Sequence, residues 1–267
     1  MPGDEVEVID SRGNVLGRGL YSPTSAIPVR IYTRDGSARI DRALFEKRID
    51  AALERRAALG LPAEGTNAYR VAHAEGDDLP GLIVDRYADT LVVQMATVGI
   101  KRREQSILDT LIEKLEPRSI VDRTSERSAK LEGFVPGHGV VWGDKTLAEL
   151  SFVERGLRFG IPLELGQKTG FYLDQRPLRE RIEALARGRR VLDTFTYVGS
   201  IAMAAARGGA TSVHAVDASA LALEVAAECA RANGLAGRIE FERADAHDVL
   251  AAAGRKGGYD LVVCDPP

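Results

Sequence analysis

Hydrophobic residues recur with two different periods along this chain, and the changes of period divide it into segments. Near the N-terminus, Val6 and Val8, and later Val29 and Ile31, lie every second residue and are separated by glycine, proline and serine. A period of two with such punctuation is typical of short β-strands. The pattern predicts a small β module over residues 1–40.

A helical pattern follows. Asp41 is a candidate N-cap, Phe45 and Ile49 fall on one stripe, and Gly60 is placed to end the helix. We expect the segment 41–65 to link two domains.

The next segment, residues 66–165, mixes both periods and predicts a compact α+β domain. Apolar residues on one stripe indicate a helix over 100–115. Gly156 suits the turn of a hairpin because glycine tolerates positive φ. Strands are expected at 69–72, 82–85, 91–95, 120–122, 150–153 and 157–161.

Residues 166–267 predict an α/β fold with a parallel, doubly wound, Rossmann-like sheet. Apolar strands alternate with helices rich in alanine and glutamate, a spacing typical of right-handed β-α-β crossovers. Four strands are fewer than such a sheet normally contains, so we expect the chain to be part of a longer protein. The strands are expected at about 190–193, 212–217, 238–243 and 260–265.

Composition narrows the function classes. The 267 residues carry a formal net charge of −3, so no global positive field would attract nucleic acid. The two cysteines form no disulfide framework, and no signal sequence or long apolar stretch is evident, which favours a cytoplasmic protein without a membrane role. The four histidines lack metal-ligand spacing, so no metal site is expected.

Three of the predicted strands end in aspartate: Asp193, Asp217 and Asp265. Parallel strands would bring these side chains to one edge of the sheet, where open α/β folds bind ligands. The turn Thr194–Gly199 lacks the Gly-x-Gly-x-x-Gly fingerprint that close approach to a pyrophosphate requires. The pattern therefore indicates a nucleoside-type cofactor without a diphosphate.

Two of the acidic residues have an alternative structural role. Asp217 is placed to accept both ribose hydroxyls, although it or Ser219 would also serve as a helix N-cap. Asp245 is placed to bind the adenine amino group, but it would equally cap the helix that begins near Ala246. The segment Gly166–Arg176 is either a loop that crosses the cofactor site or a plain interdomain linker.

Several of these motifs together resemble one family, the bacterial class I S-adenosylmethionine-dependent ribosomal RNA methyltransferases. The closest likeness is to members that make 5-methylcytosine in large-subunit (23S) rRNA. The resemblance implies a PUA domain, a central α+β domain and a Rossmann-like methyltransferase domain. The motifs are 17–25 with 29–31, 75–86, 166–176, 191–200, 216–219, Asp245 and 264–267.

The resemblance also implies a cofactor, partners and site residues. The cofactor is S-adenosyl-L-methionine, the expected substrate is 23S rRNA, and a homodimer is a further expectation. The expected catalytic residues are Asp265, Pro266 and Pro267. The expected cofactor-binding residues are Phe171, Tyr172, Gln175, Arg176, Asp193, Phe195, Thr196, Tyr197, Gly199, Asp217, Ala218, Ser219, Asp245, Ala246 and Asp265.

Methylation of cytosine at carbon 5 requires a thiolate that adds to the neighbouring ring carbon. Cys264 lies within an apolar strand, so we expect it to be buried and inert, and we expect the nucleophile to lie beyond Pro267. The family's first PUA strands would likewise precede Met1. Asp265 is expected to line the pocket for the target base, with the two prolines fixing the turn.

RNA contacts are expected from the PUA-like module and from two cationic clusters, although charged runs of this kind are also common on plain solvated surfaces. The clusters are 101–103 and the set Arg123, Arg127 and Lys130. Two other functions remain open. One is a nicotinamide-dependent oxidoreductase, and the other is a non-catalytic RNA-binding protein with a truncated methyltransferase domain.

Overall fold

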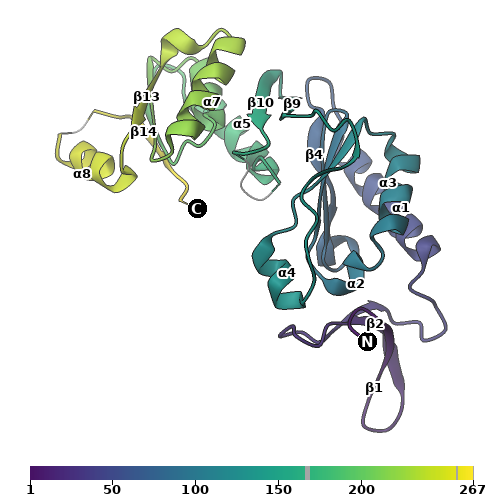
Figure 1. Cartoon of the computed structure of the whole chain (residues 1–267). Coiled ribbons are helices and arrows are strands. Elements are labelled where there is room, and N and C mark those ends of the chain that lie inside the picture. Colours follow the sequence, from purple (N-terminus) through teal and green to yellow (C-terminus); the bar gives the residue numbers. More distant parts are fainter. Residues whose placement is uncertain (166–168, 257, 267) are drawn as a thin grey trace. The chain divides into compact units, whose positions relative to one another are not determined.

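Contacts within the chain form two compact units, one built mainly from Met1–Ala148 and the other from the residues that begin at Glu149. We call them the first and the second unit and describe each by itself (Figure 1). The structure is a computed structural model that describes residues 1–165, 169–256 and 258–266. The four-segment domain division expected from the sequence stays a prediction.

The first unit begins with an antiparallel sheet of three strands in the order β1-β2-β3. The expected short strands of the N-terminal module are thereby confirmed. The strands are β1 (Glu5–Ile9), β2 (Val15–Tyr21) and β3 (Val29–Thr33).

Helix α1 (Arg42–Ala58) follows, and its predicted cap is confirmed, because the Asp41 carboxylate accepts a hydrogen bond from the backbone N–H of Leu44. Its buried residues are Phe45, Ile49 and Ala52. This face packs on the central sheet and beside α3, so the helix closes one side of the first unit's core.

The central sheet has five strands in the order β4-β5-β6-β7-β8. All neighbouring pairs are antiparallel except β6 and β7, which are parallel and are joined by a helical crossover. Helix α4 (Glu126–Glu132) and strand β8 are elements that the sequence pattern did not predict. The strands are β4 (Ala68–His73), β5 (Leu82–Tyr87), β6 (Thr90–Met95), β7 (Ser119–Asp122) and β8 (Gly139–Gly143).

The helix expected over 100–115 is confirmed from Glu104 to Leu115 but is wrong at its start, because the crossover contains two helices, α2 (Val98–Lys101) and α3 (Glu104–Leu115). The break lies at Arg103, whose φ of −106° and ψ of 11° are not helical. Its guanidinium donates to the carbonyl oxygens of Gly3 and Gly99, both at 3.0 Å. The bond to Gly3 spans 100 residues, whereas Gly99 lies four residues back in α2, so Arg103 joins the N-terminus to the break between the two helices.

The same contacts change the interpretation of the cationic cluster 101–103. Lys101 is paired with Glu104 at 2.7 Å, and Arg102 is paired with Asp4, also at 2.7 Å. Together with Arg103, these cations bind partners inside the first unit. The cluster therefore holds the N-terminal module to the crossover, and its charge is largely matched within the chain.

The second unit contains a hairpin and the expected parallel sheet. The hairpin joins β9 (Glu149–Glu154) to β10 (Leu157–Pro162), and its turn uses the predicted positive φ at Gly156, which is 78°. The four-stranded sheet has the order β13-β12-β11-β14, with every neighbouring pair parallel. Its strands are β11 (Arg190–Thr194), β12 (Ser212–Asp217), β13 (Ile239–Arg243) and β14 (Leu261–Cys264).

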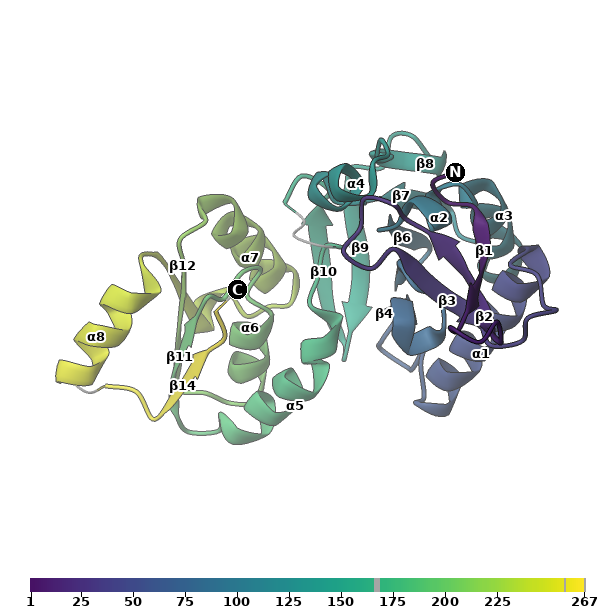
Figure 2. The same ribbon diagram turned by 90° about the horizontal axis from the view of Figure 1, so that it is seen from below.

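Helices cover both faces of this sheet, as a doubly wound fold requires. Figure 2 shows α6 and α7 on one face, with α5 on the same side, and α8 on the other. The interior between the sheet and α6 consists largely of alanine, which allows a close approach. The helices are α5 (Arg176–Leu185), α6 (Ser200–Arg207), α7 (Ala220–Ala232) and α8 (Ala246–Lys256).

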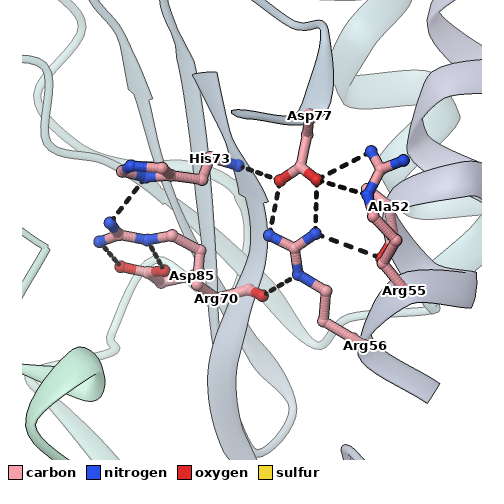
Figure 3. A network of polar contacts seen from close by, with 7 residues as sticks. All are labelled: Ala52, Arg55, Arg56, Arg70, His73, Asp77 and Asp85. Atoms are coloured by element: carbon pink, nitrogen blue, oxygen red, sulfur yellow. Dashed lines mark hydrogen bonds and ion pairs between the residues drawn. The ribbon is translucent and has the colours of Figure 1, made fainter. Parts of the chain in front are cut away.

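A buried carboxylate ties α1 to the central sheet of the first unit (Figure 3). Asp77 is 2% exposed and accepts hydrogen bonds from Arg56 at 2.5 Å, from Arg55 at 3.0 Å and from the backbone N–H of His73 at 2.7 Å. Burial by itself raises the pKa of Asp77, but the bonds from Arg56, His73 and Arg55 outweigh it and lower this pKa below 3.8. The ionised carboxylate is therefore the form that the fold stabilises.

Beside it, Arg70 on β4 makes a two-pronged ion pair with Asp85 on β5, at 2.8 and 2.9 Å. Its remaining terminal nitrogen lies 3.0 Å from Nδ1 of His73 (Figure 3). Since His73 also donates its backbone N–H to Asp77, the two carboxylates belong to one network across α1, β4 and β5.

We expect Asp77→Asn to lower the free energy of unfolding of the first unit by about 3 kcal/mol at neutral pH, because it leaves two arginines without their buried partner. Urea denaturation followed by the fluorescence of Trp142, the chain's single tryptophan, measures this. Since the native pKa is lowered, the contribution is complete above pH 3.8 and declines as the pH falls through the native value.

Asp50→Asn is the matched control, because Asp50 pairs with Lys114 at 2.7 Å on the surface, where its side chain is 50% exposed. Exposed pairs contribute about 1 kcal/mol or less, so this variant should remain close to the unchanged chain. Equal losses in the two variants would contradict the role given to Asp77.

Candidate cofactor-binding site

The order of the strands creates a ligand-binding position at one edge of the second unit's sheet. Strand β11 comes first in this sheet. The next two strands, β12 and β13, lie on one side of it, and the chain then returns to place β14 on the other side, so the strand order reverses at β11. The carboxyl ends of such diverging strands leave a crevice in which open α/β sheets bind their ligands.

The three strand-end aspartates lie at this edge, as the sequence predicted. Thr194 pairs in register with both Val216 and Cys264. Asp193 and Asp217 therefore lie in the last two residues of neighbouring strands, and Asp265 lies directly after a third. Their placement on one edge is thereby confirmed, while their roles stay predictions.

The turn from β11 into α6 has an unusual backbone. Phe195 and Tyr197 have φ values of 60° and 53°, in the left-handed region that side chains other than glycine rarely occupy, and Gly199 has a φ of 73°. A Cβ at Gly199 would lie 3.0 Å from the Cβ of Ala226, so this position favours glycine for space as well. The turn therefore reaches its shape with two strained aromatic residues instead of a glycine-rich sequence.

Asp193 is the buried member of the group, with 1% of its surface exposed. Its Oδ2 accepts a hydrogen bond from the Thr196 hydroxyl at 2.6 Å, whereas its Oδ1 is buried and has no hydrogen-bond partner among the described residues. Burial raises the pKa of Asp193 to about 7. The Thr196 hydroxyl and the backbone N–H of Ala202 act against this shift, and the charges of Asp217 and Asp265 add to it. A cationic group of a ligand would satisfy the orphaned oxygen.

Asp217 is partly exposed and is held by two backbone donors. Its Oδ2 accepts the N–H of Tyr197 and its Oδ1 accepts the N–H of Ser219, both at 2.9 Å. The Ser219 hydroxyl accepts the N–H of Ala222 and is the N-cap of α7. Of the two candidates for that cap, Ser219 supplies it, and Asp217 keeps lone pairs for a ribose. The neighbouring Ala218 is exposed at the same strand end.

Asp245 follows β13 and is exposed. Its Oδ1 accepts the backbone N–H of His247 at 2.7 Å, in the first turn of α8, which begins at the buried Ala246. Asp245 therefore caps α8 through Oδ1, and its other carboxylate oxygen, Oδ2, is left for the predicted contact with an adenine amino group.

Residues of the segment before α5 also lie at the edge of the sheet where the three aspartates gather. Tyr172 packs edge-on against Tyr197, with ring centroids 5.8 Å apart, and Gln175 donates to Asp265 at 3.1 Å. Burial raises the pKa of Tyr172, and the negative charges of Asp265, Asp174 and Asp217 add to the effect. Tyr172 and Gln175 therefore lie at the acidic edge.

Phe171 and Arg176, also predicted to bind the cofactor, lie against the β9–β10 hairpin. The Phe171 ring is buried beside two hairpin phenylalanines, and Arg176 pairs with Glu154 at 3.1 Å. Sequence reasoning missed Glu154 and Arg179, which connect the hairpin to this segment. The first part of the predicted motif, 166–168, lies outside the described residues.

The predicted catalytic motif follows β14. Asp265 and Pro266 are exposed, and Pro267 lies outside the described residues. The expectation that Cys264 is buried is wrong, because its side chain is exposed. In the described residues, β14 has a paired neighbour on one side, β11.

Within the described ranges, no helix has the length and apolar character needed to cross a membrane. In the same residues, no group of three or more histidine, cysteine, aspartate or glutamate side chains is arranged to hold a metal ion.

Two family models match the chain. The model of the S-adenosylmethionine-dependent methyltransferases matches residues 77–267, and that of the PUA-like domain matches residues 1–34. Together they span most of the first unit and all of the second.

Relatives match over the whole chain. The ribosomal RNA large subunit methyltransferases I of Shewanella denitrificans and Shewanella frigidimarina are 37% and 36% identical over 267 residues. The match covers 99% of this chain and 67% of each of those proteins. A solved structure of a candidate methyltransferase complexed with SAH superposes with a TM-score of 0.87 at 20% identity, covering 100% of this chain and 68% of that one, which shows the shared fold.

We expect binding of S-adenosylmethionine to strengthen as the pH rises through 7, by up to about tenfold per pH unit below that value. Asp193 is largely protonated below a pKa of about 7, and only its charged form attracts a cation. Titration calorimetry between pH 6 and 8 measures the slope. The asparagine of Asp193→Asn has no charge at any pH, so this variant should show a flatter pH dependence of binding. Equal slopes in the variant and in the unchanged chain would contradict the assignment of a cation contact to Asp193.

We expect Asp217→Ala to weaken binding of the same cofactor by about 1.5–3 kcal/mol, or ten- to a hundredfold, through lost hydrogen bonds to an ionised acceptor. Calorimetry at a fixed pH of 8 measures this loss. Asp248→Ala is the control, since Asp248 is exposed in the first turn of α8 and belongs to no predicted site. An unchanged affinity in Asp217→Ala would refute the ribose contact.

Proposed function

This chain belongs to the family of S-adenosylmethionine-dependent methyltransferases, and from that premise we propose that it methylates carbon 5 of a cytosine in 23S rRNA. It is an enzyme whose methyl donor is S-adenosylmethionine, which carries the methyl group on a sulfonium. The match over 99% of this chain, and 67% of each relative, to proteins named for the large ribosomal subunit RNA carries the proposal of the substrate.

The cofactor edge is suited to a cationic nucleoside. Asp193 offers a buried, unpartnered oxygen, and Asp217 offers carboxylate oxygens at the neighbouring strand end. The loop between them contains no glycine before Gly199, which suits a ligand without a diphosphate. We assign the methionine side of the cofactor to Asp193 and the ribose to Asp217.

Methylation of carbon 5 of cytosine gives the residues around Asp265 a role in the proposed reaction. In such a reaction a thiolate would add to ring carbon 6, and the methyl group would pass to carbon 5 as its bond to the sulfonium sulfur breaks and leaves the thioether. Loss of the proton on carbon 5 would then expel the thiolate. We place Asp265 in the pocket for the flipped-out base, next to Gln175, with Pro266 in the turn. Pro267 completes the predicted motif.

The two other functions are not favoured. A nicotinamide-dependent oxidoreductase would show a glycine fingerprint at the turn after β11, where this chain has Phe195 and Tyr197. A purely RNA-binding role leaves the orphaned carboxylate of Asp193 without a purpose. For location we propose the cytoplasm, where the rRNA substrate is found, and homodimer formation stays a prediction.

Methyl transfer to isolated rRNA tests the proposal. The chain, and a version extended to the length of its relatives, are incubated with 23S or 16S rRNA and isotope-labelled S-adenosylmethionine. We expect label in the 5-methylcytidine of 23S rRNA after digestion to nucleosides and mass spectrometry. Label in 16S rRNA, or on an exocyclic amine, would overturn the proposed substrate or acceptor atom.

Cys264→Ser provides the internal control for the nucleophile. Although Cys264 is exposed, we give it no catalytic role, so the extended protein with this substitution should transfer methyl groups at an unchanged rate. Loss of transfer with cofactor binding preserved would identify Cys264 as the attacking thiolate.

A further inference from the structure

An ion pair deep in the second unit joins the hairpin to α5. Glu154 at the end of β9 is 2% exposed, and Arg179 on α5 is 3% exposed. The guanidinium donates to both carboxylate oxygens, through Nε at 2.6 Å and Nη2 at 2.7 Å. This two-pronged geometry fixes the orientation of the arginine.

The same arginine makes two further contacts with the segment that precedes α5. Its Nη1 donates to the carbonyl oxygen of Tyr172 at 3.0 Å, and its guanidinium carbon lies 4.6 Å from the centre of the Phe171 ring. That ring packs on Phe152 and Phe159 of the hairpin, with centroids 5.1 and 5.0 Å away. Arg179 is therefore attached to the hairpin on one side and to the 171–172 backbone on the other.

From this segment the contacts continue to the acidic edge. The Tyr172 ring lies against Tyr197, whose hydroxyl donates to the carbonyl oxygen of Gly170 at 3.0 Å. The backbone N–H of Tyr197 is a donor to Asp217, and Gln175 is a donor to Asp265. A continuous set of contacts thus runs from Glu154 to two of the strand-end carboxylates.

Stability alone does not account for a buried arginine at this place. Replacing a buried ion pair with uncharged residues of similar volume is often neutral or stabilising, because burying the charges is itself costly. An apolar side chain, however, cannot donate a hydrogen bond to the Tyr172 carbonyl. The arginine supplies that third bond, and Glu154 holds it in the direction that the bond requires.

We propose that Arg179 is a positioning residue, oriented by Glu154, that holds the segment 170–175 in place so that Tyr172 and Gln175 line the cofactor edge. The effect on the reaction is indirect, since Arg179 contacts no strand-end aspartate. We call the Arg179–Glu154 pair and its contacts with the segment 170–175 the clamp. Its role in positioning rests on the proposed function, because it requires that the edge binds the methyl donor.

The test removes both charges at once with Arg179→Met/Glu154→Gln and titrates the intact chain with S-adenosylhomocysteine by calorimetry. We expect binding to be at least about tenfold weaker, while β11 and β12 keep their protection from amide hydrogen exchange. Amides of the segment 170–175 should exchange faster. Protected strands combined with a faster-exchanging segment distinguish lost positioning from general unfolding.

Arg207→Met/Glu183→Gln is the matched control. This pair is also two-pronged, with both bonds at 2.7 Å, and it joins α6 to α5 in the same unit. It makes no hydrogen bond to the segment 170–175 in the described part of the chain. We expect this variant to bind S-adenosylhomocysteine as tightly as the unchanged chain.

Two results would overturn the clamp. One is full affinity in Arg179→Met/Glu154→Gln, and the other is faster exchange throughout the second unit, which would make the pair merely structural. If the unchanged chain does not bind S-adenosylhomocysteine, the cofactor site and the clamp both fail. Failure of methylation on 23S rRNA alone would refute only the proposed substrate, because cofactor binding is measured without RNA.

Discussion

The acidic edge of the second unit depends on carboxylates that are held without being neutralised. Asp193 is held by a threonine hydroxyl, Asp217 by two backbone N–H groups and Asp265 by an amide side chain. These donors are uncharged, so none of them offsets the negative charge that the carboxylates carry when they are ionised. In contrast, Asp77, Asp85 and Glu154 are each paired with arginine and serve the fold.

Much of this edge was predictable from the sequence because its causes are local. An apolar run that ends in aspartate specifies a strand end, and parallel connections bring successive ends to one edge whatever the side chains do. Asp41 capped its helix and Gly156 formed its turn as expected, since capping and positive φ involve only neighbouring residues. Parallel connections likewise predict that Asp193 and Asp217 lie at one edge.

Other features were beyond sequence reasoning because their partners are distant in the chain. Arg103 leaves its helical conformation for carbonyl groups that include Gly3, 100 residues away. Arg179 and Glu154 are separated by 25 residues, and neither carries a motif.

The strained turn after β11 shows why the site acts as one unit. Left-handed conformations at Phe195 and Tyr197 cost of order 1–3 kcal/mol each, and a hydrogen bond to a charged acceptor contributes about 1.5–3 kcal/mol. The two bonds that stabilise the turn end on Asp193 and Asp217, through Thr196 and Tyr197. The conformational cost of the turn and the stabilisation by these two hydrogen bonds are therefore of the same size. Removing either carboxylate would relax the turn that orients the other, so we expect the contributions predicted for Asp193 and Asp217 in cofactor binding to be non-additive.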